Sequence, residues 1–143
     1  MCRKQNTFLS ISEEYRSEFL QAWLDHKIDL LLTVPNATPA TPHNGLRYSF
    51  ASCGYTFLFN FVDYPAGVIP VIKVDPVKDV LPKDFKPKNH VEWGAYKNYQ
   101  AEKMSGLPVG VQIIGRRLEE EWTLKGMELV EEALHKMGVR YEM

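Results

Sequence analysis

The sequence predicts an α/β fold in which four helices alternate with three strands. Apolar residues recur at helical spacing in the first and last segments, short unbroken apolar runs lie between them, and prolines or glycines close each run. Strands that alternate with helices usually pair in parallel, so we expect a mostly parallel layer. With 143 residues, 45% of them apolar and 24% charged, the chain has the composition of one ordinary globular domain.

The first half predicts a helix, a strand and a second helix. Ser10 and Glu13 have the spacing of a capping box, which predicts that the first helix begins at Ser10. Residues 30–34 are apolar without alternation and stop at Pro35, as expected of a strand covered on both faces. After a proline-rich surface loop, the aromatic-rich segment 48–61 is interpreted as a helix.

The middle of the chain predicts a strand and a long loop. Residues 68–74 are rich in β-branched side chains, and Pro70 places that strand near an edge or a bulge because proline cannot donate a ladder hydrogen bond. Segment 75–92 contains three prolines and four lysines, so we expect a solvated loop. A short helix is predicted over 93–104, ending at Gly106.

The last part predicts a buried strand over 109–115 and the clearest helix of the chain. Acidic residues 119–121 suit the positive end of a helix, and Gly138 is expected to close it. The apolar stripe of this helix is expected to comprise Trp122, Met127, Val130, Leu134 and Met137.

Charge and cysteine content exclude several classes of function. With 17 basic and 18 acidic residues the net charge is −1, so a nucleic-acid surface is not expected. The first residues carry no secretory signal, and Cys2 and Cys53 offer neither a disulfide framework nor zinc spacing, so we expect a reducing, intracellular compartment. The four histidines lack metal-ligand spacing, and neither a metal nor a cofactor is expected.

Three segments, in this order, carry a family resemblance. They are Ile28–Pro35 (IDLLLTVP), Asn60–Val71 (NFVDYPAGVIPV) and Gly106–Gly115 (GLPVGVQIIG). Together they resemble the C-terminal part of the amidase signature family over roughly residues 12–136. The likeness is greatest to the fatty acid amide hydrolase branch, which has a phrase similar to that between Tyr55 and Gly67 and a tryptophan at the spacing of Trp93.

The resemblance implies an α/β fold that forms the C-terminal part of a mixed-sheet core with flanking helices. Residues 1–143 are then a single partial domain, in which we expect residues 1–10 to be disordered. The family hydrolyses amides with a Ser-Ser-Lys triad, in which a neutral lysine activates the nucleophile through a second serine. No serine here lies in a Gly-Ser-Ser-Gly setting, so no catalytic residue carries over and this chain alone is expected to be inactive.

The resemblance also implies a substrate-binding role for four residues. In the fatty acid amide hydrolase branch the matching positions line an apolar channel for the acyl chain, and they correspond here to Phe50, Cys53, Phe57 and Trp93. Apolar walls suit a long alkyl chain, which gains about 0.8 kcal/mol per buried methylene. The expected partner is therefore a lipid amide substrate.

Plainer interpretations of these residues stay open. The two phenylalanines can be core residues, Trp93 can pack its helix against the sheet, and Cys53 can be a small buried hydrophobe. Asp63, before Tyr64 and Pro65, is expected to cap a turn rather than act as a general base.

Alternative functions are a non-catalytic module that binds an amphiphile and an amidase of small polar amides. Peripheral membrane association through segments outside this sequence, and a homodimer, are further possibilities that the sequence leaves open.

Overall fold

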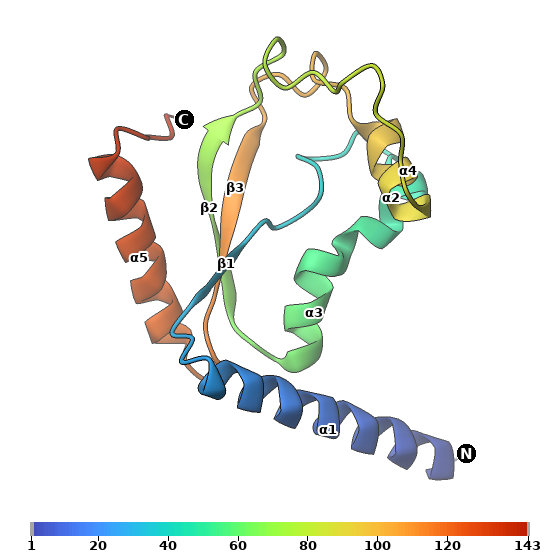
Figure 1. The fold of residues 1–143 in the computed structure, drawn as a ribbon, viewed down its shortest axis with the longest axis vertical. Coiled ribbons are helices and arrows are strands. Elements are labelled where there is room, and N and C mark those ends of the chain that lie inside the picture. Colours follow the sequence, from blue (N-terminus) through green and yellow to red (C-terminus); the bar gives the residue numbers. More distant parts are fainter. Residues whose placement is uncertain (1, 143) are drawn as a thin grey trace.

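The computed structural model describes the backbone of residues 2–142 and the side chains of residues 10–48 and 52–142. It confirms the predicted alternation of helices and strands (Figure 1). The elements are α1 (Cys2–Asp25), β1 (Leu31–Thr33), α2 (Leu46–Ser49), the 3-10 helix η1 (Phe50–Cys53), α3 (Gly54–Val62), β2 (Ala66–Lys73), α4 (His90–Asn98), β3 (Pro108–Ile114) and α5 (Glu120–Lys136). The first helix begins at Cys2, so the prediction that it begins at Ser10 was wrong, and Ser10 lies in its third turn.

The three strands form one sheet in the order β1-β3-β2, and both pairings are antiparallel. The expectation of a mostly parallel layer was therefore wrong for this part of the fold. The parallel rule assumes that the helix between two strands packs onto the sheet and carries the chain across it. Here α4, which lies between β2 and β3, packs instead on α2 and η1, at a distance from the sheet (Figure 1).

The segment between β2 and β3 leaves the sheet and returns to it at the same place. The Val74 N–H donates to the carbonyl oxygen of Leu107, and the Gly106 N–H donates to the carbonyl oxygen of Val74, both at 3.0 Å. These two bonds tie the ends of the segment together, and β3 consequently runs back along β2. We call residues 75–105 the excursion.

Helix α5 covers one face of the sheet through small residues. Thr123 and Gly126 are its buried residues, and a Cβ atom at Gly126 would collide with the side chain of Leu30. The predicted stripe is only partly right. Trp122 and Met137 are 45% and 76% exposed, because the buried face of the helix is centred on Thr123 and Gly126.

The remaining predicted stripe residues, Met127, Val130 and Leu134, are partly buried. Gly138 adopts a positive φ of 79°, which confirms that it follows the end of this helix.

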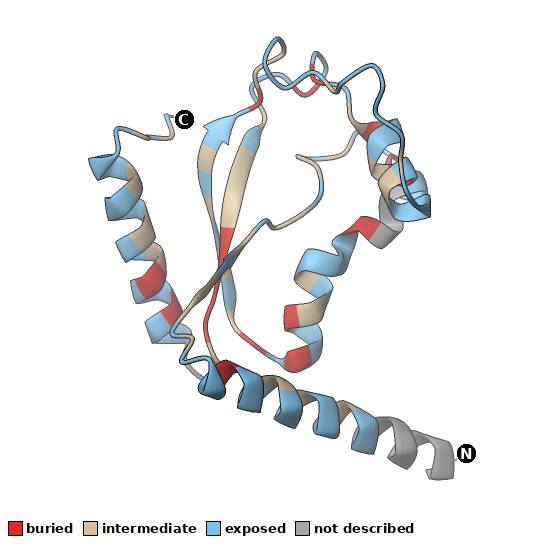
Figure 2. Cartoon of the chain, in the orientation of Figure 1, coloured by how far each residue is buried: buried red, intermediate tan, exposed pale blue. Residues whose placement is uncertain are grey.

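The main core lies where α1 and α3 meet the opposite face of the sheet (Figure 2). It consists of Trp23, Phe59, Val62, Tyr64 and Ile114, all less than 9% exposed. The ring of Tyr64 meets Trp23 edge to face, with 5.3 Å between the ring centroids. Packing of this kind joins the C-terminal end of α1 to the turn between α3 and β2.

Strand β2 contains the predicted irregularity. Its register against β3 shifts between Pro70 and Ile72, and β2 is an outer strand of the described sheet. The expectation of an edge or bulge at Pro70 is thus confirmed.

Candidate substrate-binding site

Helix α4 is the element around which the candidate site is built, and its sequence explains where it begins. The Asn89 side chain accepts a hydrogen bond from the Glu92 N–H at 2.9 Å, and the Glu92 carboxylate accepts one from the Lys88 N–H at 2.6 Å. This reciprocal capping starts the helix at His90, three residues before the predicted start at Trp93. It ends at Asn98, and residues 101–106 form turns instead of the predicted continuation to 104.

A cavity of about 540 Å³ lies between α4, the start of α3 and two loops. Its lining is predominantly apolar and aromatic, with Thr38, Ser52 and Glu92 among the polar residues. The lining residues are Ala37, Thr38, Ser52, Gly54, Tyr55, Leu81, Phe85, Val91, Glu92, Ala95, Tyr96 and Tyr99. Its volume and lining are those of a site for a small apolar ligand.

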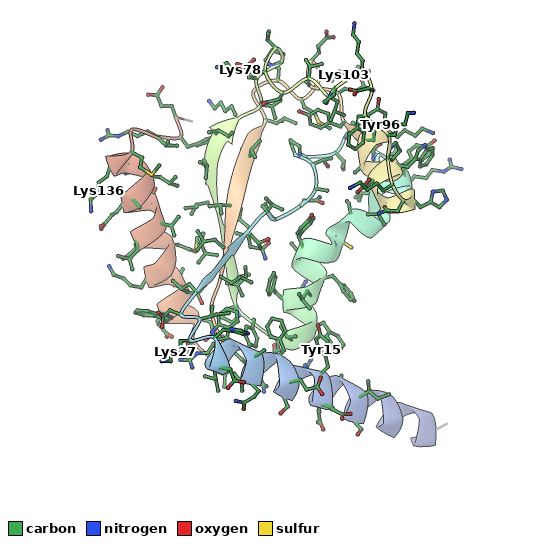
Figure 3. The ribbon with its side chains drawn as sticks, in the orientation of Figure 1. Tyr15, Lys27, Lys78, Tyr96, Lys103 and Lys136 are labelled. Carbon is green, nitrogen blue, oxygen red and sulfur yellow. The ribbon has the colours of Figure 1, made fainter. Side chains whose placement is uncertain are left out.

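The part of the excursion that precedes α4, residues 75–89, supplies one wall of this cavity. The Phe85 ring stacks on Tyr96 of α4, with ring centroids 5.2 Å apart and planes inclined by 14°. The Tyr99 hydroxyl donates to the carbonyl oxygen of Asp79 at 2.7 Å, and burial raises the pKa of this phenol. Figure 3 shows Tyr96 on α4, and Lys78 near the start of the excursion. The interpretation of 75–92 as a solvated loop was therefore only partly right, since Leu81 and Phe85 line the cavity.

A turn at the start of the excursion holds that wall in place. The Asp75 carboxylate accepts hydrogen bonds from the backbone N–H groups of Val77 at 2.9 Å and Lys78 at 3.1 Å. These two bonds lower the pKa of Asp75, because they stabilise the charged carboxylate. The Asp79 carboxylate accepts in turn from the Asp75 N–H at 2.8 Å.

The sequence offered one usable signal for this cavity, which the prediction did not use. Val91, Ala95 and Tyr99 recur four residues apart and line the cavity together. Leu81 and Phe85 gave no such signal, because they lie in a segment dominated by prolines and charged residues.

Of the four predicted site residues, Cys53, Phe57 and Trp93 lie beside this cavity and not in its lining. Cys53 and Phe57 are four residues apart on consecutive helical turns, and α4, which carries Trp93, packs on η1. Cys53 is exposed, Phe57 is 64% exposed and Trp93 is 42% exposed. The side chain of Phe50 lies outside the described residues. Their role as channel residues stays a prediction, whereas the alternative interpretations of Cys53 as buried and of Phe57 as core were wrong for this chain.

Trp93 belongs to an aromatic cluster on the other side of α4. Its ring meets Tyr48 edge to face, with centroids 6.4 Å apart. The Lys97 ammonium lies 4.9 Å from the Trp93 centroid and 4.0 Å from that of Tyr48, within cation–π range of both rings. The indole is therefore held by its neighbours even though much of it faces solvent.

Asp63 lies at the predicted turn, but its backbone N–H rather than its carboxylate caps the end of α3, by donating to the carbonyl oxygens of Asn60 and Phe59. It follows α3 in a left-handed conformation, with φ of 63°, and its carboxylate pairs with the Arg117 guanidinium at 2.8 Å. Among the side chains of residues 10–48 and 52–142, no group of three or more histidine, cysteine, aspartate or glutamate residues is placed to hold a metal ion. None of the helices described for this chain is long and apolar enough to cross a bilayer.

Comparison with known proteins places this arrangement in one family. The amidase family model matches residues 3–124. An acetamidase from Aspergillus oryzae is 37% identical over 122 residues, covering 81% of this chain and 22% of that protein. A fatty-acid amide hydrolase from Sus scrofa is 31% identical over 119 residues, covering 83% of this chain and 20% of that protein.

A solved structure of a fatty acid amide hydrolase superposes with a TM-score of 0.73 and 25% identity over 87% of this chain and 22% of that one. The helices and antiparallel sheet thus have the amidase signature fold. This chain spans about a fifth of the length of the curated relatives it matches, and it corresponds to their C-terminal part. The chain belongs to the amidase family.

Proposed function

We propose that this chain forms part of the substrate-binding region of an amide hydrolase that acts on fatty acid amides or related lipid amides. In this proposal the chain supplies apolar walls, and the Ser-Ser-Lys triad lies on polypeptide outside it. None of its six serines stands in a Gly-Ser-Ser-Gly setting.

The observation that carries the lipid preference is the apolar cavity beside α4. A ligand whose alkyl chain enters such a space gains about 0.8 kcal/mol for each methylene removed from water. Phe85 and Tyr96 offer stacked rings, and the small side chain of Ala95 lines the same cavity. A short, polar amide has no comparable use for this surface.

Relatives named for fatty acid amides support the same proposal. The proteins from Sus scrofa and Caenorhabditis elegans carry that name, as does the matching solved structure. A second candidate, hydrolysis of short amides, is favoured by the 37% identity with the Aspergillus oryzae acetamidase.

A chimera separates these two candidates. In it, the segment of the Aspergillus oryzae acetamidase that this chain matches is replaced by this chain, and kcat/KM is measured for acetamide and dodecanamide. We expect a gain in dodecanamide hydrolysis relative to the unaltered acetamidase. A chimera that hydrolyses acetamide and shows no such gain would support the short-amide candidate.

Two substitutions in the chimera locate the acyl chain. Phe85→Ala tests the cavity, and Trp93→Ala tests the predicted channel. We expect at least one of them to lower kcat/KM for dodecanamide about tenfold, which corresponds to about 1.4 kcal/mol, while acetamide changes less than about twofold. Val77→Ala, in the same excursion and 81% exposed, is the control. Equal losses for both substrates would refute the lipid assignment.

A further inference from the structure

Helix α4 presents the cavity and Trp93 on different faces. Val91, Ala95 and Tyr99 line the cavity. Trp93 and Lys97 are four residues apart and therefore share another stripe of the helix. Lys97 is not a lining residue of that cavity, and its ammonium group lies in the aromatic cluster around Trp93. A charged side chain thus accompanies the predicted channel residue.

Two aromatic rings fix the position of this charge. The Lys97 ammonium lies 4.0 Å from the centroid of the Tyr48 ring and 4.9 Å from that of Trp93. The planes of the two rings are inclined by 81°, so the ammonium lies in a corner that they form. A free lysine side chain has about 2 kcal/mol of rotamer entropy. Contact with two rings therefore localises a positive charge that would otherwise be spread over many rotamers.

No carboxylate pairs with this ammonium among the side chains that the structure describes. Lys97 forms no ion pair there, whereas ion pairs are formed by Lys78, Arg116, Arg117 and Lys125. Glu92 is the single acidic residue of α4, and its carboxylate accepts a hydrogen bond from the Lys88 N–H at the other end of the helix. The ammonium of Lys97 can therefore bind an anionic group of a ligand.

A positive charge beside Trp93 would change what an acyl channel selects. A plain alkyl chain gains free energy from apolar walls, and a charge in such a wall offers it nothing. A carboxylate accepts a hydrogen bond from an ammonium, and the attraction between them grows as both are removed from water. Binding sites also discriminate more sharply by a polar group than by one methylene. A charge at this place therefore favours an acyl chain that carries an anionic group.

We propose that Lys97 is a specificity-determining residue that binds a carboxylate carried by the acyl chain and remote from the amide. The lipid amides that suit this protein best are then monoamides of long-chain dicarboxylic acids. The inference rests on the proposed function, in which the acyl chain passes Trp93 and the amide lies at a nucleophile outside this polypeptide. For that reason the carboxylate belongs to the acyl part of the substrate and not to the amine that hydrolysis releases.

The acetamidase chimera tests this assignment with dodecanamide and the monoamide of dodecanedioic acid. The two substrates have the same number of carbon atoms, and their far ends are a methyl group and a carboxylate. We expect Lys97→Met to lower the ratio of kcat/KM for the monoamide to kcat/KM for dodecanamide about fivefold. Lys97→Arg keeps the charge and the contact with the rings, so the ratio should stay within about twofold. An unchanged ratio in Lys97→Met would show that the lysine only packs on the rings, and it would overturn the proposal.

A second lysine controls for the change in net charge. Lys136→Met makes the same change on α5, and Figure 3 shows Lys136 on the opposite side of the sheet from α4. We expect it to alter the ratio less than about twofold. Added salt should lower the ratio in the unaltered chimera and hardly affect it in Lys97→Met, because salt screens the attraction between charges. Equal effects of the two substitutions, or equal salt dependence, would assign the preference to the overall charge and refute the role of Lys97.

Three further outcomes separate this proposal from the proposed function. If the chimera gains dodecanamide hydrolysis that Phe85→Ala lowers and Trp93→Ala does not, the acyl chain does not pass Lys97, and only the Lys97 proposal fails. It fails alone also if Lys97→Met leaves the ratio unchanged and weakens inhibition by dodecanoate, because the charge then binds the product carboxylate. If the chimera gains no dodecanamide hydrolysis, both proposals fail.

Discussion

Replacing Gly110 with alanine should destabilise the sheet, whereas the same replacement at Gly67 should not. A Cβ atom at Gly110 would lie 2.8 Å from the carbonyl oxygen of Ile69 and 2.9 Å from Cγ1 of Val68. The carbonyl belongs to the paired strand β2 and moves only if the β2–β3 ladder moves. At Gly67 the obstacle is the thioether of Met127, a flexible side chain that adopts another rotamer at small cost.

The expected magnitudes differ by more than the error of measurement. Overpacking against backbone costs about 1–3 kcal/mol, and the loss of unfolded-state freedom on replacing glycine returns about 0.4–1 kcal/mol. We therefore expect Gly110→Ala to lower the free energy of unfolding by about 1–2 kcal/mol, or roughly 2–8 °C in Tm, and Gly67→Ala to be close to neutral. Urea and thermal unfolding measure both. Equal losses, or a greater loss at Gly67, would refute the packing argument.

Three further expectations concern the chemistry, the excursion and the core. A fluorophosphonate probe should not label the isolated chain under conditions in which it labels a complete amidase; covalent labelling would show that a nucleophile is present. The lowered pKa of Asp75 contributes stability that is present above its ordinary value near 3.9 and is lost as the pH falls through the lower folded value. The protection of the Val77 and Lys78 amides, measured as their exchange rate relative to the intrinsic rate at the same pH, should therefore fall on acidification. Asp75→Ala should remove that pH dependence, and a dependence that persists would assign it to another group. Ile114→Ala, at a fully buried position, should cost about 2–5 kcal/mol by urea unfolding, while Leu118→Ala, 76% exposed, should cost under about 0.5 kcal/mol, and similar values for the two would contradict the assigned core.

The order of the elements was predictable because each is punctuated locally. Pro35 ends the first apolar run, Gly106 ends the turns before β3, and Gly138 ends the last helix. The direction of the strands was not predictable in the same way, since it depends on where α4 packs. No pattern within residues 90–98 indicates that this helix packs on α2 and η1 and not on the sheet.

The predictions of where helices begin and of which face of α5 is buried were wrong for physical reasons as well. The capping-box pattern at Ser10 lies inside α1, whereas Asn89, which does cap α4, was taken as part of a loop. The face of α5 was misjudged because Thr123 and Gly126 make the closest approach to the sheet, and a hydrophobicity pattern gives such residues no weight. Small residues mark close packing only when the opposing surface is known.

The site was predicted less completely than the fold. Cys53, Phe57 and Trp93 were chosen by resemblance, and the structure places them around the helical segment that borders the cavity without making them its lining. The wall formed by Leu81 and Phe85 depends on the turn in which the Asp75 carboxylate accepts backbone hydrogen bonds. The amino-acid composition of this segment indicates only a loop. Tertiary contacts of this kind leave little trace in local patterns.

The closure of the excursion at its base has an evolutionary consequence. Backbone hydrogen bonds join Val74 to Gly106 and Leu107, at the point where β2 ends and β3 begins. Residues 75–105 therefore form a cassette whose exchange leaves the sheet register intact. Length and sequence can then diverge in this cassette while the strands below it are retained.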